Sequence, residues 1–409
     1  MQDLSTAAPR DLRRELTLFL AAVAALGIAG GIFETTFNNF LNDTFGMTAK
    51  TRGALEFPRE LPGFLVAMLG GILFFMSEIR IGALAGLTIA VGIAGLAWLG
   101  TSYGVMIAFM VIWSTGQHMM MPVSSTVTLS LAAPERRAAR MGQVGSVGVA
   151  ATLVGAAFVW IGLGYLRLGY SAAFIVAACC ACVAAAFVSR LAPLPSRSQH
   201  RPKLVLKRRY SLYYLLNIFS GARKQVFITF GPWVLIKVFG EPAPTIAKIW
   251  MVASAVGIFF QPQLGKLIDR FGERAILMCD ALLLIGVCMG YGLARELPLA
   301  NPVRLVYVCY ALDHILFAAG MARATYLAKI AENEQDIHAS LSVGVSIDHA
   351  VSMSIPTLAG MVWVLYGFPY VFLGAAGIAL CNLFAASFVD VPKPALHVEP
   401  VPAPEAMER

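Results

Sequence analysis

The chain has 409 residues, of which 58% are hydrophobic and only 13% are charged, and its formal net charge is +8. Soluble proteins carry about 25% charged residues, so this composition excludes an ordinary soluble fold. Uncharged apolar runs of about 20 residues recur along the whole length, which predicts an all-α polytopic membrane protein. The positive charge lies mostly in short loops, where it sets topology, so it does not indicate nucleic-acid binding.

The apolar runs predict twelve membrane-spanning helices. The first run, 16–33, is too long for the core of a cleaved signal peptide. The predicted limits of the spans are 15–40, 53–75, 80–100, 104–131, 141–163, 170–189, 211–237, 245–264, 274–294, 303–328, 340–365 and 369–389.

The clearest break in the chain is the segment 190–209, which is basic, contains proline and has no acidic residue. Such a segment cannot form a core, and its charge predicts a cytoplasmic location. We therefore predict an N-terminal bundle (1–189), a cytoplasmic linker (190–209), a C-terminal bundle (210–390) and a disordered tail (391–409). Both termini are expected in the cytoplasm, with the protein in the plasma membrane, or in the inner membrane of a bacterium.

An internal repeat supports two related halves. A shift of 194 residues places Gly27 on Gly221 and Phe33 on Phe227. Slightly larger shifts place Gln117-His118 on Asp313-His314, as small loop insertions would. The two halves are therefore expected to have the same helical arrangement.

Between the eighth and ninth predicted spans lies the polar segment GKLIDRFGER (265–274). It is predicted to form a short turn, with Gly265 allowing two helices to approach closely. The Asp269 carboxylate can pair with an arginine, and Arg270 and Arg274 resist crossing the bilayer. The segment resembles the signature of the major facilitator superfamily of transporters, which has the residue types of Gly265, Leu267, Asp269, Arg270, Gly272 and Arg274 at these places.

This resemblance implies two six-helix bundles around a central cavity that works by alternating access. In the first half the corresponding signature is degraded, with Phe75 and Met76 replacing its aspartate and arginine. By the symmetry of the family, Asp269 is expected beside Arg140 at the start of span five. The hypothesis is an asymmetric gate with a single electrostatic latch.

Ionisable residues at membrane depth are costly and usually line a cavity or pair with one another. Arg223 and Lys224 fall in span seven and are predicted to bind a small organic anion or zwitterion. Gln117 and His118 in span four, and Trp233, complete the predicted substrate site. The residues predicted to couple transport to protons are Glu34, Asp313, His314, Asp348 and His349.

Several other interpretations remain open. The charged residues at membrane depth can instead form a closed structural network. A copper-type metal transporter is a second hypothesis, with His118, Met121, His349 and Met353 as soft ligands. A multidrug/proton antiporter and a non-transporting sensor or assembly factor are further alternatives.

Enzymatic activity is not expected, because no P-loop or HExxH motif is present. No cofactor is expected, and the expected partners are a small-molecule substrate and the lipid bilayer, with the protein working as a monomer. The polar residues near the outer ends of spans one and two are interpreted as a solvated helix end held by local ion pairs, with an extracellular gate as the alternative. They are Asn38, Asn39, Asn42, Arg52, Glu56, Arg59 and Glu60.

Overall fold

The computed structural model describes residues 11–68, 76–133, 136–194 and 207–391, which form helices and turns and, within these ranges, no strand. The helices of the first half are α1 (Leu12–Phe45), α2 (Ala49–Ala54), α3 (Glu56–Met68), α4 (Glu78–Leu99), α5 (Tyr103–Ser130), α6 (Arg137–Gly164) and α7 (Tyr170–Ser189). Those of the second half are α8 (Ser211–Lys237), α9 (Ala243–Gly292), α10 (Pro302–Leu316), α11 (Gly320–Ile330), α12 (Glu334–Tyr366) and α13 (Phe368–Ala386). The predicted all-α membrane fold is confirmed.

Nine of the described helices are long and apolar enough to cross a membrane. One of them, α9, is two helices joined at Gly272. The shorter helices α2 and α3 and the more polar α8 are not among the nine. The span predicted at 303–328 is divided, because a 3₁₀ turn over Phe317–Ala319 separates α10 from α11. The predicted number of twelve spans fits this arrangement and stays a prediction. The degraded first-half signature lies largely in 69–75, outside the described residues.

The helix ends follow local sequence chemistry. At the start of α1, the Asp11 side chain accepts hydrogen bonds from the backbone N–H groups of Arg13 and Arg14. These bonds satisfy donors that the first helical turn leaves without partners. At the other end, Gly46 adopts a left-handed conformation (φ 58°) and its N–H donates to the carbonyl of Asn42. Glycine is favoured there because it lacks the Cβ that makes this conformation costly.

The turn in the signature segment is smaller than predicted. The helix continues through Phe271, and only Gly272 leaves helical geometry, with φ 80° and ψ 162°. The expected close approach at Gly265 is wrong, because a Cβ placed there would meet nothing within 4 Å. Gly272 is thus the glycine that the turn requires, since side-chain-bearing residues rarely adopt its conformation.

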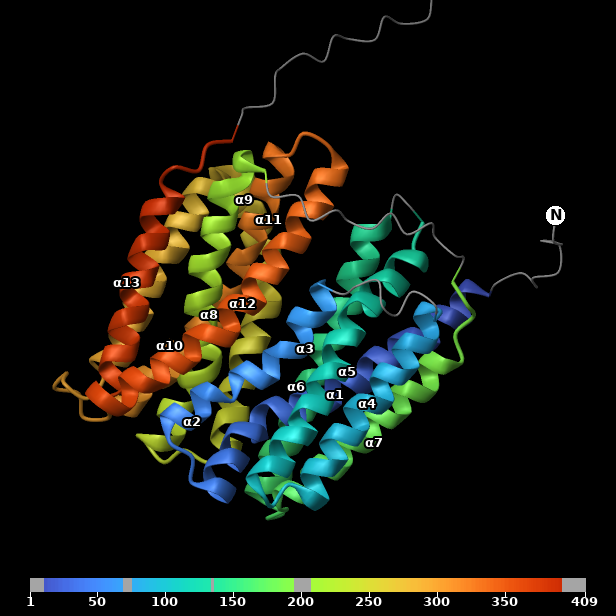
Figure 1. Cartoon of the computed structure of the whole chain (residues 1–409), viewed down its shortest axis with the longest axis horizontal. Coiled ribbons are helices and arrows are strands. Elements are labelled where there is room, and N and C mark those ends of the chain that lie inside the picture. The colour runs from blue at the N-terminus through green and yellow to red at the C-terminus, as the bar shows by residue number, and fades with distance from the viewer. Residues whose placement is uncertain (1–10, 69–75, 134–135, 195–206, 392–409) are drawn as a thin grey trace, which may run out of the picture.

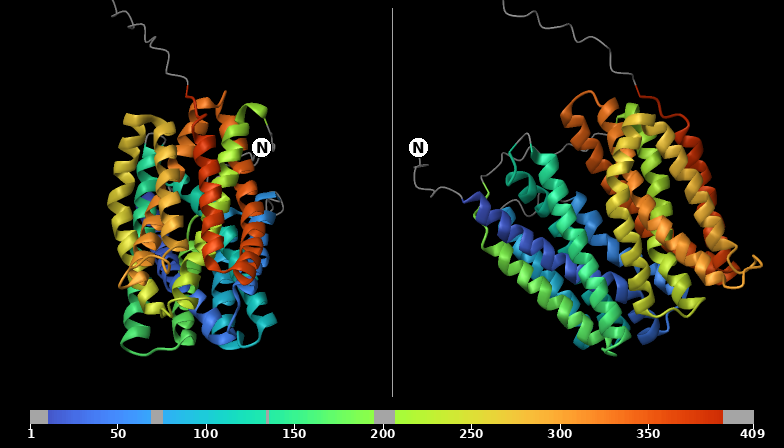
Figure 2. Two further views of the ribbon diagram at one scale, coloured as in Figure 1. Left: turned by 90° about the vertical axis from the view of Figure 1, so that its left-hand side faces the viewer. Right: turned by 180° about the vertical axis from the view of Figure 1, so that it is seen from behind.

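The helices form two groups, α1–α7 and α8–α13, which lie side by side (Figure 1). We call the end of the molecule near Leu12 and the segment before α8 the linker end, and the opposite end the far end. The two groups diverge toward the linker end and meet toward the far end, as the view from behind also shows (Figure 2). Contacts between the groups are made mainly by α2, α3 and α6 with α9 and α12.

At the far end the two groups touch backbone to backbone. A Cβ on Gly53 of α2 would lie 2.1 Å from the carbonyl oxygen of Pro356 in α12, and 3.2 Å from Phe230. In the same contact, a Cβ on Gly360 would lie 2.6 Å from the carbonyl oxygen of Ala49. Small residues at such positions let membrane helices approach closely. These two glycines therefore hold the far-end seam together.

Candidate functional site

A buried ion pair lies at the centre of the C-terminal bundle. Arg223 on α8 pairs with Asp313 on α10, and both side chains are largely buried. The Nε atom of Arg223 is buried with no hydrogen-bond partner among the described residues. The guanidinium also lies 5.7 Å from the ring centroid of Phe227. This pair is well shielded, so opening it leaves a buried charge without a partner.

A second ion pair is more accessible. Lys224, the next residue on α8, pairs with Asp348 on α12, and their side chains are 20% and 32% exposed. Both residues line a cavity of about 250 Å³ in the C-terminal bundle. The structure therefore brings together the four charged residues that were predicted at the middle of these spans.

Other polar groups line the same cavity. Arg323 of α11, Asp280 of α9 and Asn217 of α8 contribute to its wall, together with Tyr213. The Oδ1 atom of Asp280 is buried and has no hydrogen-bond partner among the described residues. The cavity thus presents three cations and two carboxylates, which is a wall suited to a charged solute.

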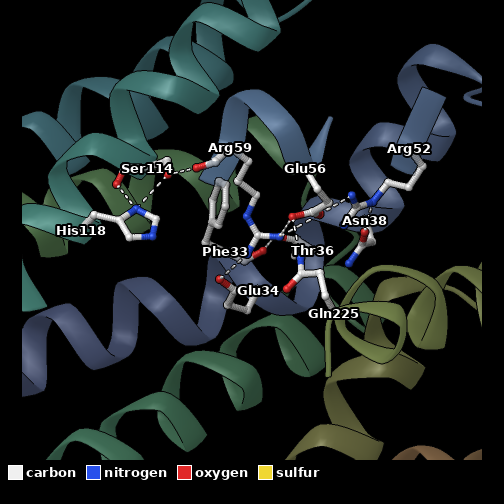
Figure 3. Close-up of polar contacts among 10 residues, drawn as sticks. All are labelled: Phe33, Glu34, Thr36, Asn38, Arg52, Glu56, Arg59, Ser114, His118 and Gln225. Carbon is white, nitrogen blue, oxygen red and sulfur yellow. Dashed lines mark hydrogen bonds and ion pairs between the residues drawn. The ribbon is translucent and has the colours of Figure 1, made fainter. Parts of the chain in front are cut away.

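A separate charged cluster joins the two bundles (Figure 3). The Glu56 carboxylate on α3 accepts hydrogen bonds from Arg52 at 2.5 Å and from Arg59 at 3.1 Å. It also accepts one at 2.9 Å from Gln225 of α8 in the other bundle. We call the group formed by these residues with their neighbours the junction cluster; its members are Glu34, Asn38, Arg52, Glu56, Arg59 and Gln225.

The interpretation of these residues as a solvated helix end is wrong. Arg52 is 1% exposed and Glu56 is fully buried. The Nε atom of Arg52 donates to Asn38 at 2.8 Å, and the Arg59 guanidinium lies 5.6 Å from the ring centroid of Trp113. The predicted local ion pairs are present, but they are buried at the junction of two bundles, where charges are costly unless paired.

Glu34 is the accessible member of the junction cluster. Its side chain is 41% exposed, and its carboxylate lies 4.0 Å from the Arg59 guanidinium. The preceding residue, Phe33, is buried against Trp113, with ring centroids 4.2 Å apart. Because adjacent helical residues point about 100° apart, Phe33 packs into the core while Glu34 faces away from it.

Two predicted histidines meet across the bundles beside the junction cluster. His118 on α5 and His349 on α12 lie edge to face, with ring centroids 5.0 Å apart. The Nδ1 atom of His349 lies 3.0 Å from Oε2 of Glu60 on α3. The Nδ1 atom of His118 lies 2.8 Å from the carbonyl oxygen of Ser114. One ligand atom from each of Glu60, His118 and His349 lies within 4.8 Å of the others.

The remaining predicted substrate and proton residues lie elsewhere. Gln117 is exposed, so His118 is the member of that pair that reaches the other bundle. His314 contacts Ser254, with Nε2 3.2 Å from its hydroxyl, and does not join the other histidines. Trp233 is fully buried in the core, so its assignment to the substrate site is wrong for this conformation.

The two methionines predicted as soft ligands lie in different environments. Met121 is 61% exposed, whereas Met353 is buried. The group that converges on His118 and His349 contributes a carboxylate, Glu60, as its third ligand. The predicted histidines are therefore together, but with a harder third ligand than the sequence indicated.

The predicted latch is not formed in this conformation. Asp269, Arg270 and Arg274 are exposed, and no ion pair joins Asp269 to Arg140 in the described part of the chain. Arg140 instead donates to Gln143 at 2.6 Å. The paired carboxylate at this turn is Glu273, which contacts Lys329 of α11 at 2.6 Å. The Asp269–Arg140 pairing stays a prediction for a state in which the linker ends come together.

Sequence reasoning placed Arg52 and Glu56 outside the substrate site and did not consider Gln225. A usable signal was present, because Arg52, Glu56, Arg59 and Glu60 recur at helical spacing at the start of the second predicted span. Charges repeated at intervals of three or four residues lie on one face of a helix. A membrane helix with a charged face must turn that face toward protein or water.

Comparisons with known proteins agree with this architecture. A family model described as Major Facilitator Superfamily matches residues 19–346. No curated protein matches the sequence significantly. A mutant form of the nucleoside transporter NupG is similar in structure, with a TM-score of 0.75, 15% identity, and coverage of 91% of this chain and 98% of that one.

Two further solved structures are similar. A bacterial homologue of the human lysosomal transporter Spinster, inward-facing and occupied, has a TM-score of 0.71 and 18% identity, covering 95% of this chain and 100% of that one. The human organic anion transporter MFSD10 (TETRAN) has a TM-score of 0.59 and 14% identity, covering 92% and 100%. The family match, over most of the chain, shows that this protein belongs to the Major Facilitator Superfamily of transporters.

Proposed function

We propose that the protein is a proton-coupled secondary transporter of a small organic anion or zwitterion. The observation that carries the proposal is the accessible Lys224–Asp348 pair in the wall of the cavity of about 250 Å³. The cavity is small, which suits a solute smaller than a typical drug. Transport then proceeds by alternating access between the two bundles.

The two ion pairs have different roles in this proposal. Lys224 and Asp348 are partly exposed, so their attraction is weakened by solvent, and a substrate anion can compete for Lys224. Arg223 and Asp313 are shielded and position the neighbouring residue on α8. Arg323, which also lines the cavity, supplies a second cation for the substrate.

Exchange at Lys224 provides the coupling step. When a substrate carboxylate forms an ion pair with Lys224, the Asp348 carboxylate is left without a cationic partner inside the protein. An unpaired carboxylate at that depth is costly and takes up a proton. When the substrate leaves, Lys224 returns to Asp348 and the proton is released. The ion pair thus links one substrate anion to one proton.

The proposed location is a plasma membrane, or the inner membrane of a bacterium, with the linker end and both termini in the cytoplasm. Arg13, Arg14, Arg190, Arg208 and Arg209 gather at the linker end, as the positive-inside rule requires.

The substrates named for the similar transporters suggest which compounds to test as ligands. One similar structure is a nucleoside transporter and another is an organic anion transporter. Small carboxylates, amino acids, nucleosides, amines and sugars are therefore to be compared. Met121 is 61% exposed whereas Met353 is buried, which disfavours copper carriage through both residues together.

The test is ligand-induced thermal stabilisation in detergent, followed by uptake into proteoliposomes with and without a pH gradient. A ligand at 100 times its Kd stabilises by about 2.7 kcal/mol, which is readily measured. We expect a small anion or zwitterion to stabilise wild type but not Lys224→Ala. The matched control is Lys237→Ala on the same helix, whose ammonium lies 5.7 Å from the Trp233 ring centroid.

The coupling step is tested separately with Asp348→Asn. We expect this variant to exchange substrate but to lose accumulation driven by the pH gradient. Stabilisation by nucleosides, amines or sugars alone would overturn the assignment of substrate class. Uptake by Asp348→Asn that kept its full response to the gradient would remove Asp348 from coupling.

A further inference from the structure

Three side chains with metal-binding groups converge where the bundles meet. Glu60 comes from α3, His118 from α5 and His349 from α12, and one ligand atom of each lies within 4.8 Å of the others. Imidazole nitrogen and carboxylate oxygen are ligands of zinc-type ions. We propose that Glu60, His118 and His349 bind a divalent transition-metal ion of the zinc type, and that the bound ion joins the two bundles.

The hydrogen bonds of His118 prepare it as a ligand. Its Nδ1 atom lies 2.8 Å from the carbonyl oxygen of Ser114, which can only accept, so Nδ1 carries the proton. The Nε2 atom is then left with a free lone pair. The Ser114 hydroxyl, 3.1 Å from the same Nδ1, donates to the carbonyl oxygen of Arg59. Metal-binding histidines are commonly fixed in this way through their second nitrogen.

Glu60 and His349 are already spaced as ligands of one ion. Their closest atoms, Oε2 and Nδ1, lie 3.0 Å apart. Two ligands at about 2.1 Å from a tetrahedral zinc ion lie about 3.4 Å from each other. Without metal, an imidazole N–H in this position donates to the carboxylate. Metal binding replaces that proton, and two side chains from different bundles then share the ion.

The backbone beside the site leaves room for both rings. A Cβ on Gly63, on the same helix as Glu60, would lie 2.4 Å from Cδ2 of His118 and 2.5 Å from Cε1 of His349. Any larger residue would displace the two rings that supply nitrogen ligands. Gly63 therefore permits the contact between His118 and His349 that brings the ligands together.

The origin of the ligands gives the site a conformational consequence. Glu60 and His118 belong to the N-terminal bundle, whereas His349 belongs to the C-terminal bundle. All three converge only while the bundles are together at this level. A ligand that binds one conformation better shifts the population toward it. The ion therefore favours the arrangement with the far end closed.

Binding is tested on the full-length protein, purified in detergent without a polyhistidine tag. Zinc is titrated by calorimetry, and cobalt(II) is used as a spectroscopic probe of ligand type and geometry. We expect one ion per protein and a cobalt spectrum of nitrogen and oxygen ligands without a thiolate band. The affinity is expected to fall at least tenfold in His349→Ala and in Glu60→Gln. Ser114→Ala is expected to weaken binding about 10- to 100-fold.

His314→Ala is the matched control, because His314 contacts Ser254 and lies outside the ligand group. It is expected to bind zinc as wild type does. Zinc is also expected to raise the thermal unfolding temperature of wild type but not that of His349→Ala. Gly63→Ala, which keeps all three ligands, is expected to bind more weakly and covers the case in which a ligand variant fails to fold.

Three results would overturn the proposal. The first is the absence of stoichiometric zinc or cobalt binding by wild type. The second is unchanged affinity in both His349→Ala and Glu60→Gln. The third is binding of Cu(I) alone, which would assign the histidines to a thioether site. None of these measurements depends on the transported substrate, so they leave the proposed transport function to its own test.

Discussion

Gln225 of the C-terminal bundle donates a hydrogen bond of 2.9 Å to Glu56 of the N-terminal bundle. The same carboxylate also accepts hydrogen bonds from Arg52 and Arg59, which belong to its own bundle. A single buried carboxylate therefore pairs with two cations and links the bundles. Ser114 connects this cluster to His118, because its hydroxyl donates to the carbonyl oxygen of Arg59 and lies 3.1 Å from Nδ1 of His118.

We expect Glu56→Gln to destabilise the protein strongly. The variant keeps the shape of the side chain but leaves Arg52, which is 1% exposed, without its ionic partner. Breaking a buried ion pair from one side costs about 3–5 kcal/mol. Thermal unfolding in detergent measures the loss. The control is Glu296→Gln, at an exposed loop position, and equal unfolding temperatures for the two variants would contradict the structural role of Glu56.

Gly53→Leu is expected to separate the bundles at the far end. Its side chain must enter a space in which a Cβ alone would lie 2.1 Å from the carbonyl oxygen of Pro356. Overpacking of this kind costs about 1–3 kcal/mol, and here the seam can relieve it by opening. Hydrogen exchange measured by mass spectrometry should rise in α2 and in the far half of α12.

The control for this substitution is Gly374→Leu. Gly374 is exposed on α13, and a Cβ there would meet nothing within 4 Å. Its exchange pattern should match wild type. Unchanged exchange in Gly53→Leu would show that α2 and α12 do not form a tight seam in solution.

The fold was predictable from sequence because hydropathy and helix formation in a membrane are local properties. A run of apolar residues such as 170–189 must satisfy its backbone hydrogen bonds internally, so it becomes a helix whatever surrounds it. The position of the turn was less predictable. Gly265 and Gly272 occupy the same polar segment, and only the backbone conformation distinguishes the one that turns, at φ 80°.

The partners of the charged residues were not predictable. Arg223 and Lys224 are adjacent and point in different directions, so each can meet a different helix. Their pairing with Asp313 and Asp348 depends on the rotation of α8 against α10 and α12, which one sequence does not specify. Glu60 was missed for a similar reason, because its nearest partner, His349, is 289 residues away.

Asp336 gives a pH-dependent prediction outside the membrane-spanning part. Lys207 donates to its Oδ2 at 2.6 Å and Tyr210 donates at 2.8 Å, and these hydrogen bonds lower the pKa of Asp336 below its ordinary value. Glu332 also contacts Lys207, at 3.3 Å, and Arg209 at 3.1 Å. The contacts tie the start of α8 to the start of α12.

The lowered pKa of Asp336 determines how its contribution to stability changes with pH. Because the pKa is lower in the folded state, the stabilisation is complete above the unfolded value of about 3.9 and is lost as the pH falls through the folded value. We expect Asp336→Asn to lower the unfolding temperature at pH 7 but much less at pH 3. A difference from wild type that stayed constant between these pH values would contradict the ion pair.

Trp233→Ala tests the correction made to the substrate site. The side chain is fully buried, and its loss should cost about 3–5 kcal/mol as for other large core residues. Trp98→Ala, at a position 68% exposed, should change the unfolding temperature little. If Trp233→Ala kept wild-type stability and lost only ligand binding, the residue would belong to the substrate site after all.

Asp269→Asn tests the latch at the linker end. In this structure Asp269 is exposed and Arg140 contacts Gln143, so removing the charge breaks no ion pair among the described residues. In a state with the linker ends together, the resemblance implies that Asp269 meets Arg140, so the variant should depopulate that state alone. Hydrogen exchange in the first turns of α6 and in α9 around Gly272 should therefore increase. Asp390→Asn, an exposed carboxylate at the same end, is the control. Equal exchange in the two variants would remove Asp269 from any gate.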